Sequence, residues 1–269
     1  LEHVTHSLTR PPRILAFDEQ DSLLLMEDVG TFTELNDVQL SSQIAESIGQ
    51  RLGAFIGNLH RTTFKDPELS NIFQNEEIQS VRYQVQYESA HEYAGVEDSQ
   101  VKNQIKEKSQ SLGKSLQQSN SGTCLLMGDL WPSSIFVGNG GTIRLIDWEF
   151  VHYGRPLQDV GHFAAHCWMQ GHIQRDKTSI SPWMDLWRHF FSAYKSSTGE
   201  IYPQLLVEKE KNDIGIHIGT EILVRTSGPF KDGYIYGSID KEHPLLVEAN
   251  EVAVELIINK KRAREIFNF

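Results

Sequence analysis

Between residues 41 and 60, apolar side chains recur every three or four positions, which is the spacing of one face of a helix. That face consists of Ile44, Ile48, Leu52, Phe55, Ile56 and Leu59. Ser41 or Ser42 can cap the first turn, because a serine hydroxyl accepts a hydrogen bond from a free backbone N–H group. We therefore expect a helix over about 41–60.

Upstream of this helix, two runs rich in β-forming residues follow a proline pair. The segment "RPPR" at 10–13 ends any helix that comes before it. "RILAFDE" and "SLLLMEDVG" come next, with the polar "DEQDS" between them. Two such runs around a polar turn predict a β-hairpin that leads into the acidic, Gly-terminated segment 27–30.

The rest of the chain combines polar stretches, short strands and helices. Residues 62–120 are polar and rich in Gln and Ser, with weakly helical stretches at about 76–92 and 98–118. Three strands are expected at "CLLM", "IFVG" and "TIRLIDWEF", with "GNGG" at 138–141 as the hairpin turn between the last two. Helical patterns then follow at about 158–172, 181–198, 203–227 and 244–267.

The composition is that of an ordinary globular protein, with 39% hydrophobic and 23% charged residues. A formal net charge of −11 argues against a broad surface for nucleic acid or anionic membrane. The basic run "NKKRAR" at 259–264 fits a solvated helix face. Two cysteines without metal-ligand spacing, no signal-like segment and no apolar run of about 18 residues predict a reducing, cytoplasmic location.

Two aspartates interrupt the strand-forming region, at positions 129 and 147. A core built only for packing would avoid carboxylates there. An aspartate at a strand end, followed by a loop and a hairpin that carries a second aspartate, suits metal-assisted phosphoryl transfer. One carboxylate orients the attacking hydroxyl and accepts its proton, while the other holds Mg²⁺ against the nucleotide phosphates. Asp129 and Asp147 are therefore candidates for these two tasks.

The segment "GDLWPSSIFV…IRLIDWEF" resembles the catalytic loop and metal motif of the aminoglycoside phosphotransferase/choline kinase-like family. Four further segments resemble the family in the right order: "LLLMEDVG", "LGAFIGNLHRTTF", "EFVHYGRPLQDVGHF" and "HIGTEILVR". The resemblance covers roughly residues 2–269. It implies an α+β, protein-kinase-like, two-lobed fold, with residues 1–30 as the remnant of the N-lobe and the hinge, and 31–269 as a mainly helical C-lobe.

The resemblance also assigns roles to individual residues. It makes Asp129 the catalytic base and Asp147 the principal Mg²⁺ ligand. Ser134, five residues after Asp129, stands where the family places a second metal ligand, normally Asn. Met127 replaces a histidine that usually braces the loop, and Asp159 matches a buried aspartate that anchors it.

The cofactors and the acceptor follow from the same resemblance. Glu27, Asp28 and Val29 match the hinge, whose backbone groups pair with adenine. The cofactors implied are ATP and Mg²⁺, and the partner is a small molecule with a hydroxyl group. The expected activity is phosphorylation of that hydroxyl, with no role in binding nucleic acid or membrane.

The front of the chain departs from the family pattern. Only 26 residues precede Glu27, and the first lysine of the sequence is Lys65, beyond the hinge. The family's phosphate-pairing lysine and Gly-containing hairpin therefore have no counterpart. Glu2 could match the helix glutamate that normally pairs with that lysine, and it would lack this partner. Either the chain is a fragment of a longer protein or half of the N-lobe has been lost. We expect this chain to be weakly active or inactive.

Alternative interpretations remain for the protein and for several residues. A catalytically dead, pseudokinase-like binding or regulatory protein is the main rival, and a metal-dependent hydrolase is a remote one. His162 and His166, four residues apart, fit ordinary histidines of a half-buried helix better than a metal site. Trp131 and Trp148 could wall a pocket or pack in the core. His60 fits a structural role, and Glu149 could contact substrate or cap a turn.

Overall fold

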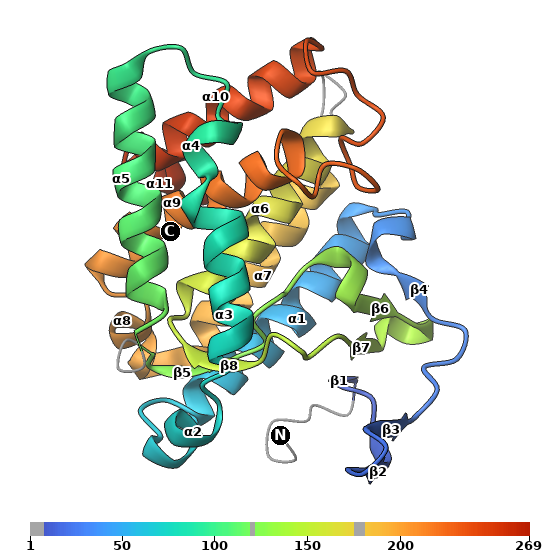
Figure 1. Ribbon diagram of the computed structural model, residues 1–269. Helices are drawn as coiled ribbons and strands as arrows, with labels where there is room; N and C mark the ends of the chain where they lie inside the picture. The colour runs from blue at the N-terminus through green and yellow to red at the C-terminus, as the bar shows by residue number, and fades with distance from the viewer. Residues whose placement is uncertain (1–7, 119–121, 175–180) are drawn as a thin grey trace.

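The computed structural model describes residues 8–118, 122–174 and 181–269 of the chain. Figure 1 shows a helical body with most of the small strands toward one side and two further strands beneath the helices. Three small sheets occur within the described ranges, and helices make up most of the remainder. The predicted α+β class, with a mainly helical part after residue 31, is confirmed. The proposed boundary at residue 30 stays a prediction.

The largest sheet has four strands in the order β1-β7-β6-β4. The strands are Thr9–Arg10 (β1), Ile143–Leu145 (β7), Ile135–Val137 (β6) and Thr33–Glu34 (β4). β6 and β7 pair antiparallel, with Val137 opposite Ile143, and β1 runs parallel to β7. The expected hairpin turn between β6 and β7 is therefore confirmed, and Gly140 and Gly141 adopt the positive φ that it needs, 67° and 71°.

The N-terminal hairpin is also confirmed, as β2 (Ile14–Asp18) antiparallel to β3 (Leu23–Met26). Every residue of both strands is exposed. A third sheet joins β5 (Cys124–Leu126) to β8 (His152–Gly154), a strand that the sequence did not predict.

The strand expected over 142–150 is shorter than predicted and ends at Leu145. Two residues later Asp147 has a φ of 65°, in the left-handed region. A strand cannot continue through that conformation, so the chain turns away and returns as β8. The turn displays the carboxylate of Asp147 at the end of the sheet rather than within it.

The body is centred on α1 (Ser42–Thr62) and α7 (Pro182–Thr198), which pack closely together. The Ser41 hydroxyl accepts a hydrogen bond from the Ile44 N–H group at 3.3 Å, which confirms the predicted cap. Glycines let the two backbones approach: a Cβ on Gly53 would lie 2.0 Å from the carbonyl oxygen of Phe190.

Gly53→Ala should therefore destabilise the protein by moving α1 away from α7. We expect a loss of unfolding free energy at or above the upper end of about 1–3 kcal/mol, the usual cost of overpacking a core. Urea unfolding followed by circular dichroism measures it. The neighbouring Ala54→Ser, at a half-buried position of the same helix, should cost only about 0.5 kcal/mol. Equal losses for the two variants would contradict the close approach.

The remaining helices pack around and beside this pair (Figure 1). They are Pro67–Ile72 (α2), Glu76–Arg82 (α3), Ala90–Tyr93 (α4), Ser99–Leu116 (α5), Leu157–Ile173 (α6), Tyr202–Leu205 (α8), Glu208–Thr226 (α9), Pro244–Ile258 (α10) and Arg262–Phe267 (α11). A π-helical segment, Tyr83–Glu88, separates α3 from α4.

The long helices expected at the C-terminal end are each interrupted. The helix predicted over 203–227 divides into α8 and α9, because Val207 is extended with a ψ of 168°. The helix predicted over 244–267 divides into α10 and α11, because Asn259 is extended with a ψ of 104°. The apolar spacing continues through both breaks, so the prediction of one continuous helix was wrong in each case.

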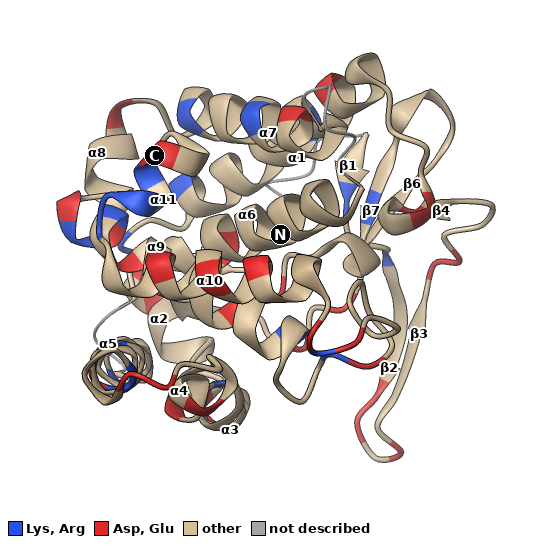
Figure 2. Ribbon diagram, turned by 90° about the horizontal axis from the view of Figure 1, so that it is seen from above, with Lys and Arg blue, Asp and Glu red and all other residues tan. Residues whose placement is uncertain are grey.

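Charged residues cover the surface in mixed fashion, and the basic residues of α11 lie near acidic ones (Figure 2). Arg262 pairs with Glu255 at 2.8 Å, and Arg264 pairs with Glu208. A solvated helix face was predicted for 259–264, and two arginines of this run are in fact ion-paired at the surface. Among the described residues, no helix is both long and apolar enough to cross a membrane.

Candidate active site

The loop that carries Asp129 is anchored from below by a buried aspartate. The N–H groups of Met127 and Gly128 donate to the Asp159 carboxylate at 2.9 and 2.8 Å. His60 lies 3.0 Å from the same carboxylate and 3.0 Å from the Tyr194 hydroxyl. The structural roles expected for Asp159 and His60 agree with these contacts. The Met127 side chain cannot form the hydrogen bonds of the histidine that it replaces, and the backbone hydrogen bonds to Asp159 brace the loop instead.

Gly128 brings this loop against the segment that follows Asp147. Its φ is 88°, and a Cβ there would lie 2.1 Å from the carbonyl oxygen of Phe150. Only glycine fits such an approach. The loop of Asp129 and the loop of Asp147 are therefore packed directly on each other.

Asp129 is held through one of its two carboxylate oxygens. Its Oδ1 accepts a hydrogen bond from Arg82 Nη2 at 3.0 Å and lies 3.2 Å from His162 Nε2. No residue in the described ranges donates a hydrogen bond to Oδ2. Burial would raise the pKa of Asp129, but the hydrogen bond and charge of His162 and the charge of Arg82 outweigh it and lower the pKa to about 2. The carboxylate is therefore ionised at neutral pH.

Asp147 lies at the same cavity as Asp129 but has no partner. Within the described part of the chain, its exposed carboxylate makes no hydrogen bond or ion pair. Burial and the negative charge of Asp129 raise the pKa of Asp147. Both line a cavity of about 310 Å³. The expectation that they face a common cleft is confirmed.

The carboxylates at this cavity fit a hard cation such as Mg²⁺. Glu149 is exposed and lines the cavity. Its carboxylate, like that of Asp147, makes no hydrogen bond or ion pair with another described residue. Two unpaired carboxylates two positions apart offer the oxygen ligands that Mg²⁺ prefers. The sequence left open whether Glu149 contacts a ligand or caps a turn, and its place at the cavity favours the first.

Ser134 is placed differently from Asp147. It is buried, and its hydroxyl donates to the backbone oxygens of Trp131 at 2.8 Å and Asp129 at 3.3 Å. It therefore braces the loop, and it is not among the residues that line the cavity. Its role as a metal ligand stays a prediction.

The hinge residues lie at the end of the β2–β3 hairpin. Glu27 pairs with Arg10 at 2.6 Å and Arg13 at 3.1 Å, and the hydrogen bond from Arg10 is the main reason that its pKa is lowered to about 2. The Asp28 carboxylate accepts a hydrogen bond from the Gly30 N–H group at 2.8 Å. Both side chains thus have structural partners, and pairing of residues 27–29 with adenine stays a prediction.

Lys65, the first lysine of the sequence, does not line the cavity of Asp129 and Asp147. Lys65 follows α1, where its N–H group donates to Thr123 and its Nζ lies 5.0 Å from the centre of the Phe64 ring. Glu2 lies outside the described residues.

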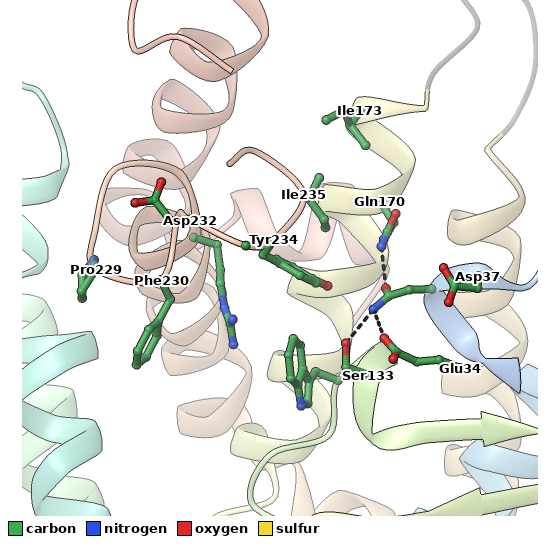
Figure 3. Close-up of a pocket in the computed structure, with 14 residues that line it drawn as sticks. Glu34, Asp37, Ser133, Gln170, Ile173, Pro229, Phe230, Asp232, Tyr234 and Ile235 are labelled. Carbon is green, nitrogen blue, oxygen red and sulfur yellow. Dashed lines mark hydrogen bonds between the residues drawn. The ribbon is translucent and has the colours of Figure 1, made fainter. Parts of the chain in front are cut away.

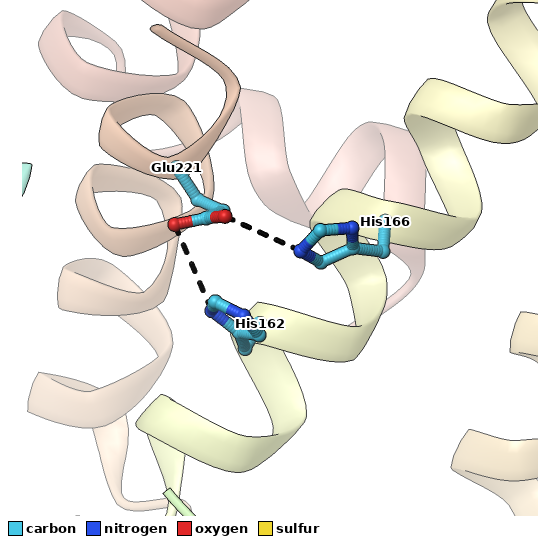
Figure 4. Close-up of side chains that lie close together, drawn as sticks. All are labelled: His162, His166 and Glu221. Atoms are coloured by element: carbon cyan, nitrogen blue, oxygen red, sulfur yellow. Dashed lines mark ion pairs between the residues drawn. The ribbon is translucent and has the colours of Figure 1, made fainter. Parts of the chain in front are cut away.

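A buried cluster behind Asp129 was not predicted (Figure 4). Glu221 on α9 lies 3.2 Å from His166 and 3.8 Å from His162, and Arg225 pairs with it at 2.8 Å. Burial lowers the pKa of His166 to about 3, so that this ring is neutral. The four-residue spacing of the histidines on α6 was visible in the sequence, and Glu221 lies in the family-like segment "HIGTEILVR", but neither signal placed the carboxylate opposite the histidines.

Two histidines and a carboxylate are also a donor set that zinc accepts. Here, however, Arg225 balances the charge of Glu221, and His166 Nδ1 lies 2.7 Å from the Tyr234 hydroxyl. The cluster therefore balances its charge without a metal. It connects Asp129, through His162, to α9. The expected half-buried helix is in fact a largely buried one.

A second cavity, of about 620 Å³, adjoins the first (Figure 3). The two share Trp131, Arg225 and Phe230. The Arg225 guanidinium lies 4.8 Å from the ring centre of Trp131 and 5.3 Å from that of Phe230, so this wall is a packed cation–π unit. Trp131 thus walls both cavities, whereas Trp148 packs edge-on against Phe55 in the core at 6.4 Å.

This chain is similar to several proteins that are small-molecule kinases by name. The 4-hydroxytryptamine kinases of Psilocybe cyanescens and Psilocybe cubensis are 30% and 27% identical, over 61% and 63% of this chain. These matches cover 48% and 50% of the two kinases, so the chain spans about half their length. The choline kinase LicA from Streptococcus pneumoniae has a TM-score of 0.47 at 14% identity, covering 92% of this chain and 74% of that one.

An ethanolamine kinase from Plasmodium vivax gives the same TM-score and identity, over 92% of this chain and 67% of its own. Because both TM-scores are under 0.5, the assignment rests on sequence. Residues 2–177, well over half of the chain, match the phosphotransferase enzyme family. That match includes the loops of Asp129 and Asp147 and confirms the resemblance on which the protein-kinase-like fold class was predicted. The chain belongs to the phosphotransferase enzyme family.

Proposed function

We propose that this protein transfers the γ-phosphoryl group of ATP to a hydroxyl group of a small molecule. One observation carries the proposal: Asp129 and Asp147 line the same cavity, and no other described residue pairs with Asp129 Oδ2 or with the Asp147 carboxylate. Family membership supports the reaction type. The activity is proposed for the whole protein, since the similar kinases are about twice as long as their matched segments.

Asp129 is proposed as the base. Its Oδ2 would orient the acceptor hydroxyl and receive its proton as the hydroxyl oxygen bonds to the γ-phosphorus. The bond from that phosphorus to the bridging oxygen breaks at the same centre, and its electron pair leaves with ADP. Because the pKa of Asp129 is about 2, the carboxylate is ionised at neutral pH and ready to take part.

Asp147 and Glu149 are proposed to hold Mg²⁺, with Ser134 as a further candidate, and residues 27–29 to hold adenine. When bound, ATP would supply the phosphoryl group and Mg²⁺ would neutralise its phosphate charge. The left-handed conformation of Asp147 supports this role, because it turns the carboxylate out of the sheet toward the cavity.

The lining of the cavity supports an aromatic alcohol that carries an amine as the acceptor. Trp131, Phe150 and Phe230 offer ring faces, which can pack on an aromatic ring and attract a cationic amine. The compound in the name of the two similar kinases, 4-hydroxytryptamine, has this chemistry. We include choline-like and sugar-like alcohols as comparison acceptors.

The test incubates the protein with Mg²⁺–ATP and each acceptor, and detects the phosphorylated product by mass spectrometry. We expect product with aromatic hydroxy-amines above the level of the Asp129→Asn variant. Mg²⁺-dependent binding of ATP without product from any acceptor would favour the binding-protein alternative instead.

A further inference from the structure

We propose that Arg82 is a positioning residue that fixes the carboxylate of the catalytic base, an inference that rests on the proposed function. Arg82 and His162 both approach Oδ1 of Asp129, at 3.0 and 3.2 Å. Two partners on one oxygen restrict rotation of the carboxylate about its Cβ–Cγ bond, so they also fix the position of the second oxygen. Oδ2 is thereby directed away from both, where an acceptor hydroxyl can reach it.

Arg82 is itself firmly held. It is the last residue of α3, and its side chain is only 5% exposed. The π-helical segment that follows interrupts the regular helix at this point, a feature that occurs often beside functional sites. Its guanidinium also lies over the ring of Phe150, 4.7 Å from the ring centre. A charge in such a buried position is weakly screened by solvent.

These contacts join the two loops that carry the reacting carboxylates. Asp129 belongs to one loop, and Phe150 follows Asp147 on the other. One guanidinium therefore contacts both loops, by a hydrogen bond on one side and a stacked ring on the other. We infer that Arg82 sets the position of the base relative to the metal-binding aspartate. A misplacement of about 1 Å at such a site can cost on the order of 10²-fold in rate.

The competing explanation is that Arg82 only attaches α3 to the body. Arg155 provides a matched control for it. Its side chain is 3% exposed, and it pairs with Glu210 at 2.8 Å and Asp213 at 2.6 Å. None of these three residues lines the cavity. Removing either arginine breaks a buried ion pair, but only Arg82 contacts Asp129.

The experiment compares Arg82→Met, Arg82→Lys and Arg155→Met with the parent protein in steady-state kinetics. We expect Arg82→Met to lower kcat by about 10- to 100-fold, with the KM for ATP unchanged. Arg82→Lys should recover part of kcat, because an ammonium can reach Asp129 but cannot stack on Phe150 in the same way. Arg155→Met should lower stability and leave kcat as in the parent.

A second measurement does not need turnover. Urea midpoints of Arg82→Met, Asp129→Asn and the double variant form a cycle, and we expect their shifts to be clearly non-additive. Additive shifts, or a kcat for Arg82→Met equal to that of Arg155→Met, would overturn the role of Arg82. If the parent phosphorylates no acceptor, the proposed function fails, and the cycle still decides whether Arg82 constrains Asp129.

Discussion

Replacing Asp129 by asparagine should lower the rate of phosphoryl transfer by about 10²- to 10⁴-fold, the contribution of a positioned general base. The amide keeps the shape of the carboxylate, and its oxygen can still accept a hydrogen bond from Arg82. It cannot accept the proton of the acceptor hydroxyl. Binding of ATP should change little, because Asp129 is not proposed to contact the nucleotide. Steady-state kinetics and calorimetry measure the two quantities separately.

Asp185→Asn serves as the control for this variant. Asp185 pairs with Arg188 on the outer surface of α7, so the change removes one carboxylate charge at a place that does not line the cavity. It should leave the rate unaffected. A parent-like rate for Asp129→Asn would show that another group accepts the proton.

Replacing Asp147 by asparagine should abolish the Mg²⁺-dependent part of ATP binding, because the main ligand charge for the cation is lost. Ser134→Ala should weaken this part only modestly, since its hydroxyl is engaged with backbone oxygens. Ser134→Asn could strengthen it if the side chain reaches the metal. Calorimetry with ATP, with and without Mg²⁺, measures each variant.

The pH dependence adds a second test of the same ligand. Burial and the charge of Asp129 raise the pKa of Asp147, so its carboxylate gains a proton at a higher pH than an ordinary aspartate. A protonated carboxyl group does not bind Mg²⁺, and the metal-dependent affinity should therefore fall early as the pH is lowered. Equal affinity of Asp147→Asn and the parent, with and without Mg²⁺, would remove Asp147 from the metal site.

Sequence patterns predicted those helices and turns that are determined by residues close together in the chain. The helix from Ser42 has a serine cap and a regular apolar face, and the turn at 138–141 has its glycines, so both were predicted. The breaks at Val207 and Asn259 were not, because apolar spacing continues across them. The strand β8 was missed because its pairing with β5 joins segments that are distant in the sequence.

The same distinction holds at the site. Asp129 and Asp147 could be predicted because each belongs to a motif with fixed neighbours. Arg82 could not, because a lone arginine on a polar helix carries no signal. Glu221 lies in the family-like segment "HIGTEILVR", but that segment did not indicate which side chains surround Asp129. Only packing brings α3 and α9 to Asp129 and reveals which charges surround it.

The exposed β2–β3 hairpin has a consequence for how the molecule unfolds. A ribbon that buries none of its own side chains can open without uncovering the core between α1 and α7. Its closure depends on its ladder of backbone hydrogen bonds and on the ion pairs of Glu27 with Arg10, Arg13 and, at 3.8 Å, Arg144. Its amide protons should accordingly exchange with solvent through local opening, well before those of the helical body. Residues 27–29, which we propose to hold adenine, would then belong to the least cooperative part of the protein, and nucleotide binding should slow their exchange.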